Sequence, residues 1–436
     1  MANFIVETTK KVIVNHSGLV FIANYLNDVR FFSRINKISK IKKSSGVISD
    51  YDIIKTFIAL ITLGKTDFED VELYRKDKFF KKVLNLHTVP SSVTLRQRLE
   101  SYGEEMWEVL RETNLEWLQN HIANETIEIN EVPYIILESD VTPMDNSGSK
   151  KEGVTKTYKQ FFGFAPMMSY FGKSGFMLNN ELREGSCHSN CEGTDKYFEE
   201  TIGLTKQLGS YPLLAIMDSG NDDSKLVLHF KELGTEFIIK RNLRREPIDT
   251  YKEYAISKGK KIESKNYVGC TVYYSNWERE VKGEKIPISV VVTEYKKDRK
   301  GLDYLIPQYD VEVYWNSLNL DAEQVEELYH QHGTSEQYHS EFKSDLDMER
   351  LPSGKFESNY CFMLMGMLSF NLLRFLGKEL LATGLVPGKR GLRLRIRTVL
   401  QNIMYMGCQY ISKAHRNTIK VFEEYLWTPC FVALFE

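Results

Sequence analysis

The segment from residue 132 to residue 240 constrains the fold most, because strand patterns and helix patterns follow one another there in a definite order. Runs of β-branched and aromatic residues predict strands, and longer amphipathic runs predict helices. The predicted order is three strands, helix, strand, helix, strand, over 132–137, 160–172, 175–183, 194–208, 213–217, 222–233 and 236–240. Three successive strands favour a meander, and strands joined through helices favour crossover units. The sequence therefore predicts an α/β protein with a mixed sheet.

This order is similar to that of a ribonuclease H-like sheet, and the rest of the chain divides around it. With 436 residues, the chain is long enough for two or three domains. Helical patterns prevail at the N-terminus, and a block of alternating β-type runs precedes the C-terminal helical patterns. We expect an N-terminal helical domain, the first part of a ribonuclease H-like core, a β-rich insertion, and the second part of the core with C-terminal helices, over 1–130, 131–245, 246–318 and 319–436.

Two aspartates follow predicted strands of the mixed sheet. Asp140 comes soon after the first strand, and Asp218 directly follows the fourth. A ribonuclease H-like sheet places its first and fourth strands side by side, so both carboxylates would meet at one edge. Mg²⁺ prefers such oxygen ligands, together with substrate phosphate. A lone aspartate at either position would equally suit a turn or a helix N-cap.

A polar stripe runs along a helix predicted over residues 326–343. Tyr329, His332, Glu336 and Lys343 lie at positions 0, +3, +7 and +14 from Tyr329, which share one narrow face at 3.6 residues per turn. A phenol, an imidazole, a carboxylate and an ammonium are too polar for a face packed in a core. The alternative is an ordinary solvated face.

The stripe resembles the Y-x2-R-x3-E-x6-K signature of DDE transposases from cut-and-paste bacterial insertion sequences. Tyr329, Glu336 and Lys343 fit this spacing, and His332 stands where arginine is usual. The segments 140–142 (Asp-Val-Thr) and 218–220 (Asp-Ser-Gly) are similar to the two aspartate motifs of the group. The resemblance covers roughly residues 50–380.

The resemblance implies an enzyme that cuts DNA at transposon ends and transfers the cut strands into target DNA. Asp140, Asp218 and Glu336 would be the catalytic residues and would ligate two Mg²⁺ ions, for which Mn²⁺ can substitute. It also implies an N-terminal domain that binds terminal inverted repeats in double-stranded DNA, and a homodimer in the synaptic complex. Two alternatives stay open: a ribonuclease H-like endonuclease or resolvase, and a domesticated DNA-binding protein without catalysis.

The resemblance also implies contacts with DNA beside the cleaved bond. Tyr329 and Lys343 would hold phosphates. His332 cannot form the bidentate fork of arginine, so it makes a weaker contact or an arginine such as Arg350 replaces it. In relatives with a β-strand insertion, a hairpin intermediate places a flipped base on an aromatic side chain. The candidates are Trp277 and Trp315, although packing is the commoner role of such residues.

Basic residues outside the signature give further candidates for DNA contact. The net charge of −2 is no obstacle, since local patches make phosphate contacts. A predicted short helix after Pro90, capped by Ser92 or Thr94, presents Arg96 and Arg98 and would suit a helix-turn-helix element or a plain bundle. The other patches are equally compatible with solvated faces; they include Lys240 with Arg241, and five cations between 389 and 397.

Cysteine usage and hydropathy indicate the compartment. The six cysteines are scattered and predict no disulfide framework, so Cys187 and Cys191 are expected to be reduced thiols rather than zinc ligands. No run of about 18 apolar residues predicts a membrane span, and the N-terminus has no secretory pattern. The expected location is the bacterial cytoplasm, in association with the nucleoid.

Overall fold

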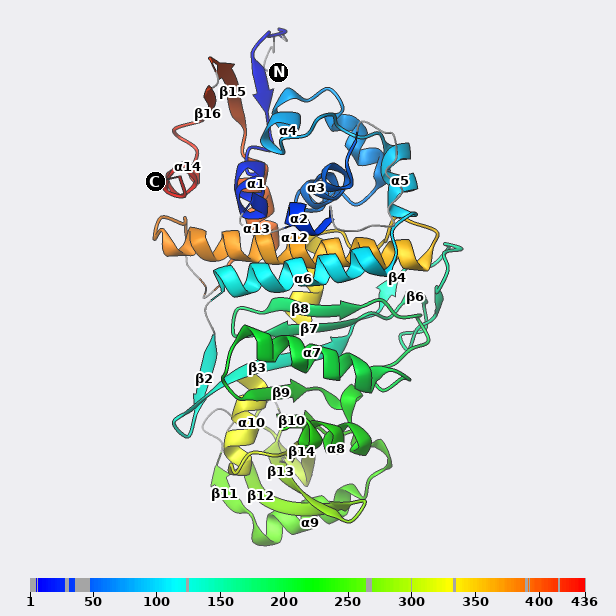
Figure 1. Cartoon of the computed structure of the whole chain (residues 1–436). Coiled ribbons are helices and arrows are strands. Elements are labelled where there is room, and N and C mark those ends of the chain that lie inside the picture. Colours follow the sequence, from blue (N-terminus) through cyan, green and yellow to red (C-terminus); the bar gives the residue numbers. More distant parts are fainter. Residues whose placement is uncertain are drawn as a thin grey trace. The chain divides into compact units, whose positions relative to one another are not determined.

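The computed structural model describes most of the chain, in two compact units (Figure 1). The described residues are 5, 7–27, 31–35, 48–122, 125–263, 269–298, 300–331, 335–388, 391, 393–414 and 416–435. Unit 1 takes its described residues from Met1–His121, Met144–Val154 and His339–Glu436. Unit 2 takes its described residues from Ile122–Pro143 and Thr155–Tyr338. These units group the chain differently from the four predicted segments, because residues from both ends of the sequence share unit 1.

Within its described residues, unit 2 is built on one ten-stranded mixed sheet with the order β11-β12-β13-β14-β10-β9-β3-β7-β8 and with β2 paired to β3. The strands are β2 Thr126–Ile129, β3 Val132–Val141, β7 Met167–Phe171, β8 Phe176–Glu181, β9 Leu213–Met217, β10 Glu236–Lys240, β11 Lys260–Glu263, β12 Cys270–Val281, β13 Glu284–Lys297 and β14 Asp303–Asn316. The β3, β7 and β8 strands are antiparallel neighbours, as the meander prediction required.

The parallel part of the sheet agrees with the sequence prediction. β3 pairs in parallel with β9, and β9 in parallel with β10. The expectation that the first and fourth predicted strands are neighbours is therefore confirmed. α7 (Thr194–Leu208) connects β8 to β9, and α8 (Ser224–Glu232) connects β9 to β10. The predicted strand 160–172 is two strands instead, β6 Phe162–Phe164 and β7, because Pro166 between them cannot donate to a ladder.

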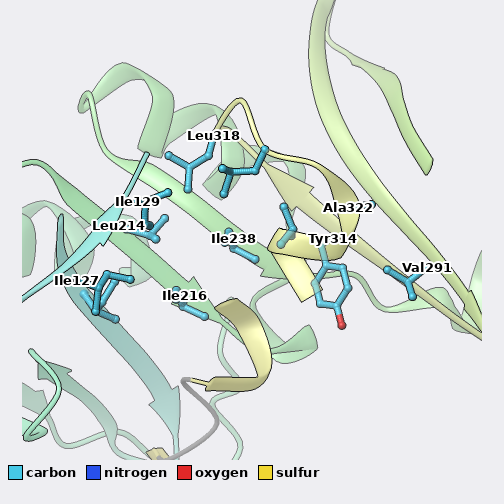
Figure 2. Packing of buried hydrophobic residues seen from close by; sticks show 12 residues of the cluster. Ile127, Ile129, Leu214, Ile216, Ile238, Val291, Tyr314, Leu318 and Ala322 are labelled. Atoms are coloured by element: carbon cyan, nitrogen blue, oxygen red, sulfur yellow. The ribbon is translucent and has the colours of Figure 1, made fainter. Parts of the chain in front are cut away.

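The two faces of this sheet are covered by different helices. On β9 and β10, Leu214, Ile216 and Ile238 belong to a buried cluster with Ala322 and Val325 of α10 (Ala322–Gln331) (Figure 2). Phe237 points to the opposite face, since successive side chains alternate along a strand. There its ring contacts Phe230 of α8, 6.3 Å between centroids. The sheet is thus buried on both faces, which explains the continuous apolar runs of its central strands.

The predicted β-rich insertion continues the same sheet. After α9 (Ile248–Lys258), the strands β11 to β14 form an antiparallel ribbon, and β14 pairs with β10. The register places Ile239 opposite Trp315 and Lys240 opposite Tyr314. This block therefore adds four strands to the central sheet.

Unit 1 is mainly helical. The described α-helices of five or more residues that lie wholly in unit 1 are α1 Leu19–Asn27, α2 Phe31–Ile35, α3 Asp50–Ile61, α4 Lys78–Val83, α5 Ser92–Leu99, α6 Glu104–His121, α12 Phe356–Ala382 and α14 Thr428–Ala433. β1 (Val12–Val14), β15 (Cys408–Lys413) and β16 (Arg416–Val421) form a small antiparallel sheet. The sequence predicted helices up to about residue 415, so β15 corrects that prediction: Tyr410 is buried against Phe79, with ring centroids 5.3 Å apart.

The α12 helix is the core of unit 1. It is long and apolar enough to cross a membrane by length and composition, although the sequence predicted no span, and 94% of its most apolar window is buried inside the protein. Phe362 of α12 packs on Phe57 of α3, and Phe375 packs on Trp117 of α6. Burial of this kind is what a core helix achieves without a membrane.

Candidate active site

The two predicted aspartates lie on neighbouring parallel strands. Asp140 is the ninth residue of β3, and its carboxylate accepts a hydrogen bond from the Val141 amide at 2.7 Å. Asp218 directly follows β9 and is the N-cap of the short 3₁₀ helix η2 (Ser219–Asn221). Its carboxylate accepts from the Gly220 amide at 2.9 Å and from the Asn221 side chain at 3.2 Å. Asp218 is therefore both a capping residue and a rigidly placed ligand candidate.

Glu336 adds a third carboxylate from a different element. It is the second residue of α11 (Ser335–Ser340), and its side chain is exposed. Burial and the charges of Asp218 and Glu336 raise the pKa of Asp140 to about 8. Burial and the charge of Glu336 also raise the pKa of Asp218. Such mutual effects require the three groups to be near one another, so the structure brings the predicted triad together.

Asp145 and Glu138 are the acidic residues closest to Asp140 in the sequence, so each is an alternative ligand beside Asp218. Asp145 is exposed in unit 1, and its carboxylate accepts from the Ser147 amide in a turn at 2.8 Å, which lowers its pKa. Glu138 is buried in β3, two residues before Asp140 and on the same face of the strand. Asp140 is therefore better placed than Asp145 to bind a metal ion together with Asp218.

A cavity of about 450 Å³ lies beside the two aspartates, entirely within unit 2. Tyr158 lines it, and burial together with the three acids raises the pKa of this phenol to about 12. The rest of the lining consists of Val141, residues 188–190, residues 218–220, Asp222, Asn242 and Arg244. Sequence reasoning missed Tyr158, and it reached Arg244 only as a member of the basic patch around Lys240 and Arg241, because neither residue stands in a spaced motif.

The helix predicted over 326–343 is described in part. α10 covers the segment up to Gln331, α11 begins at Ser335, and the π-helical turn η4 (Glu341–Asp345) follows, while residues 332–334 lie outside the described residues. The described part of the predicted helix is helical, with π-helical rather than α-helical geometry from Glu341. His332 lies outside the described residues, and Lys343 lies in η4, in unit 1.

Tyr329 lies in α10 near the acids. Its ring packs on that of Tyr314, and burial with the charges of Asp218, Glu312 and Asp140 raises its pKa. The ammonium of Lys240 lies 5.7 Å from the ring centroid of Tyr329 and pairs with Glu312. Tyr329 and Lys240, both predicted to contact DNA, thus belong to one neighbourhood.

The other predicted DNA-contacting arginines have protein partners. Arg241 is buried: its guanidinium pairs with Glu246 at 2.8 Å and lies 4.6 Å from the ring of Trp315. In unit 1, Arg98 of α5 pairs with Asp50, and the exposed Arg96 pairs with Glu69 at 3.1 Å. The N-cap of α5 is Ser91, not Ser92 or Thr94 as predicted, because Ser91 is the last extended residue and accepts from the Thr94 amide. Their roles in DNA binding stay predictions.

Three other candidates from the sequence have specific contacts in the structure: Trp315, Trp277 and the basic patch 389–397. Trp315 is buried and donates to Asp222 at 2.7 Å, so its ring has a packing role in this structure. Trp277 stacks on Tyr254, with centroids 4.5 Å apart. In the 389–397 patch, Lys389 and Arg390 lie outside the described residues, and the other three arginines pair with Glu341 or Asp345: Arg393, Arg395 and Arg397.

The expectation of reduced thiols at Cys187 and Cys191 is wrong in this structure. The two residues form a disulfide, since the chain between them turns back to a Cα separation of 5.7 Å. His188, Ser189 and Asn190 inside this loop line the cavity. The Asn190 side chain donates to the Gly220 carbonyl at 3.1 Å, next to Asp218. The loop is therefore a covalently closed wall of the site.

The described residues contain a second group of possible metal ligands. Glu312, Glu326 and His330 could hold an ion by spacing. However, Lys240 and Tyr314 donate to Glu312, and Tyr274 donates to Glu326. These donors already satisfy the carboxylates, so the triad is the better metal site.

Comparison with known protein families identifies the family of this chain. The family model described as "Transposase DDE domain group 1" matches residues 3–436. The chain belongs to this family of DDE transposases. Among curated proteins, none matches the sequence of this transposase. A solved structure, the cryo-EM structure of the piggyBac transposase synaptic complex with hairpin DNA, matches with 10% identity and a TM-score of 0.43, over 90% of this chain and 80% of that one.

Proposed function

We propose that this transposase cleaves DNA at the ends of its own element and transfers the cut strands to target DNA, in a cut-and-paste reaction. The observation that carries the proposal is that Asp140 and Asp218 lie on the neighbouring parallel strands β3 and β9 beside one cavity, with Glu336 close enough to raise the pKa of both. The strand order around β3 and β9 supports a ribonuclease H-like core. Terminal inverted repeats, target DNA and a second copy of the chain are the proposed partners.

The acidic triad fits divalent metal ions. Asp140 is half-buried, and two other carboxylates oppose its ionisation. Cations would relieve this repulsion, and Mg²⁺ prefers carboxylate oxygens and phosphate. Asp140, Asp218 and Glu336 would hold two Mg²⁺ or Mn²⁺ ions. When bound, these ions would activate the attacking oxygen and stabilise the leaving 3′ oxygen.

The residues of the chain would orient the reaction. The ends of β3 and β9 fix Asp140 and Asp218, so the sheet determines where the scissile phosphate must lie. Hydrolysis forms a bond from water oxygen to phosphorus and breaks the bond to the 3′ oxygen, which leaves as a hydroxyl. That hydroxyl then attacks a second phosphodiester, with one P–O bond formed and one broken. Neither step needs a covalent enzyme intermediate.

The test is cleavage of DNA that carries the inverted repeats flanking the gene, with Mg²⁺ or Mn²⁺. We expect wild type to cleave at the repeat ends, and Asp140→Asn, Asp218→Asn and Glu336→Gln each to lose at least 100-fold in rate, in line with removal of one preorganised charged group. Asp145→Asn is the matched control and should cleave like wild type. Cleavage that survives in the Asp140→Asn variant would reject this site, and no cleavage by wild type would favour a DNA-binding protein without catalysis.

A further inference from the structure

Arg244 differs from the neighbouring cations Lys240 and Arg241 because no acidic side chain of the described residues pairs with it. Lys240 and Arg241 pair with Glu312 and Glu246. Arg244 is exposed, lines the cavity beside Asp140 and Asp218, and its guanidinium has no hydrogen bond or ion pair within the described part of the chain. One free guanidinium therefore faces the solvent-filled space next to the triad.

The turn that carries Arg244 is held in place by several contacts. Asn242 is the N-cap of the 3₁₀ helix η3 (Leu243–Arg245), and its side chain accepts from the Arg244 amide at 3.2 Å. The Asn242 amide donates to Asp222 at 2.8 Å, and Trp315 donates to the same carboxylate. Because Asp222 follows η2 directly, these bonds tie the turn to the segment that carries Asp218.

A cation at this place suits the chemistry of the cavity. A phosphodiester that approaches Asp140 and Asp218 brings a further negative charge to a site already rich in carboxylates. A guanidinium is always protonated and offers two parallel N–H donors that match the oxygens of a phosphate. The turn holds this guanidinium in place, and no acidic side chain of the described residues forms an ion pair with it.

We propose that Arg244 binds a phosphate of the DNA strand next to the scissile bond. This inference rests on the proposed function, because it assigns a phosphodiester to the same cavity. Arg244 is then a substrate-binding residue that the sequence signature does not contain. In this chain it supplies a bidentate arginine, which His332 of the signature cannot.

The matched control is Arg245, an exposed arginine in the same turn that does not line the cavity in the described residues. Nicking of supercoiled plasmid in Mn²⁺ and cleavage of inverted-repeat duplexes in Mg²⁺ are measured under single-turnover conditions. We expect Arg244→Ala to lose roughly 10- to 100-fold in rate, as for a charged hydrogen-bonded contact. Arg244→Lys should recover only part of this loss, and Arg245→Ala should stay within about twofold of wild type.

Binding of the same duplex in Ca²⁺ gives a second readout. The dependence of log affinity on log salt should become shallower by about 1 in Arg244→Ala, since one phosphate contact is lost. A wild type that cleaves, together with Arg244→Ala that cleaves and binds like Arg245→Ala, would overturn the inference and leave the proposed function intact. A wild type that does not cleave at all would overturn the proposed function instead. Melting curves of both variants confirm folding, and Arg244→Gln serves if alanine unfolds the turn.

Discussion

Asp140 combines a rigid position with an unfavourable charge. It is held in a strand and half-buried, and the carboxylates of Asp218 and Glu336 oppose its ionisation. A metal-free protein therefore keeps a proton on this group under conditions where a free aspartate has lost it. The clustered carboxylates that suit the site to cations destabilise the folded protein when no cation is bound.

This leads to a pH prediction for the metal-free protein. Unfolded Asp140 releases its proton near the ordinary value of 3.8, and folded Asp140 near 8. Between these values the folded state holds more protons, so the free energy of unfolding falls as pH rises, by at most about 1.4 kcal/mol per pH unit. Urea unfolding in EDTA at pH 5, 6.5 and 8 should show this fall in wild type and a weaker one in Asp140→Asn. Parallel curves for the two proteins would contradict the prediction, and added Mg²⁺ should restore wild-type stability at pH 8.

The sequence predicted the position of a side chain where that side chain lies at the end of a predicted strand or directly after it. Asp218 directly follows the short apolar strand β9, and Asp140 lies near the end of the longer strand β3, so both positions could be placed. Arg244 and Tyr158 could not, because their proximity to the triad depends on how loops fold back over the sheet. Arg241 shows the converse: its charge suggested a surface role, yet Glu246 and Trp315 enclose it.

At the scale of elements, the loop closed by Cys187 and Cys191 controls one wall of the site. Within it, the Asn190 amide donates to Nδ1 of His188 at 3.1 Å, so the remaining proton of a neutral His188 is on Nε2. The loop residues line the cavity, and Asn190 bonds to the segment carrying Asp218. Reduction of the disulfide would remove the covalent bond that holds this loop closed beside the cavity.

We therefore expect thiol reductants to loosen the loop. Amide hydrogen exchange in peptides covering 186–192 should accelerate in dithiothreitol, and the rate of DNA cleavage should fall several-fold, because a mobile wall positions substrate less well. Cys187→Ser/Cys191→Ser is the control: it should match reduced wild type and be insensitive to dithiothreitol. Unchanged exchange on reduction would show that the hydrogen bonds alone hold the loop.

Elements were predicted well wherever the hydrophobic pattern was strong, as for α7, β9 and β10. The failures have local causes. The stripe from Tyr329 to Lys343 assumed α-helical spacing throughout, although Lys343 lies in the π-helical turn η4. The short strands β15 and β16 escaped prediction because their burial comes partly from Phe79, more than 300 positions earlier.

At the scale of the molecule, unit 1 is discontinuous in sequence. Helices from the first 121 residues pack on α12, which lies in the last hundred. Besides the ring contacts with α3 and α6, the Asn371 side chain in α12 donates to Asn114 in α6 at 2.7 Å, and both groups are buried. No pattern in a single sequence reveals which distant helix completes a core, so the predicted N-terminal domain ended at residue 130.

The arrangement predicts how fragments behave. Residues 1–130 alone should lack stable structure, since the apolar faces of α3 and α6 lose the helix that covers them. Co-expression with residues 339–436 should increase helical circular dichroism and protection from proteolysis. Asn371→Asp in that second fragment should weaken the association, because it places a charge in the buried bond to Asn114. A 1–130 fragment that folds cooperatively by itself would refute this view.

The pairing of β14 with β10 has a further consequence. Through this pairing, the ribbon that precedes Asn316 covers one backbone edge of β10, whose side chains Phe237, Ile238 and Ile239 are all buried. Without the ribbon, β10 would be an apolar edge strand with unpaired amides, the kind of surface that recruits strands from other molecules. A shortened transposase lacking residues 246–316 would therefore aggregate, and the ribbon protects the solubility of the sheet as well as extending it.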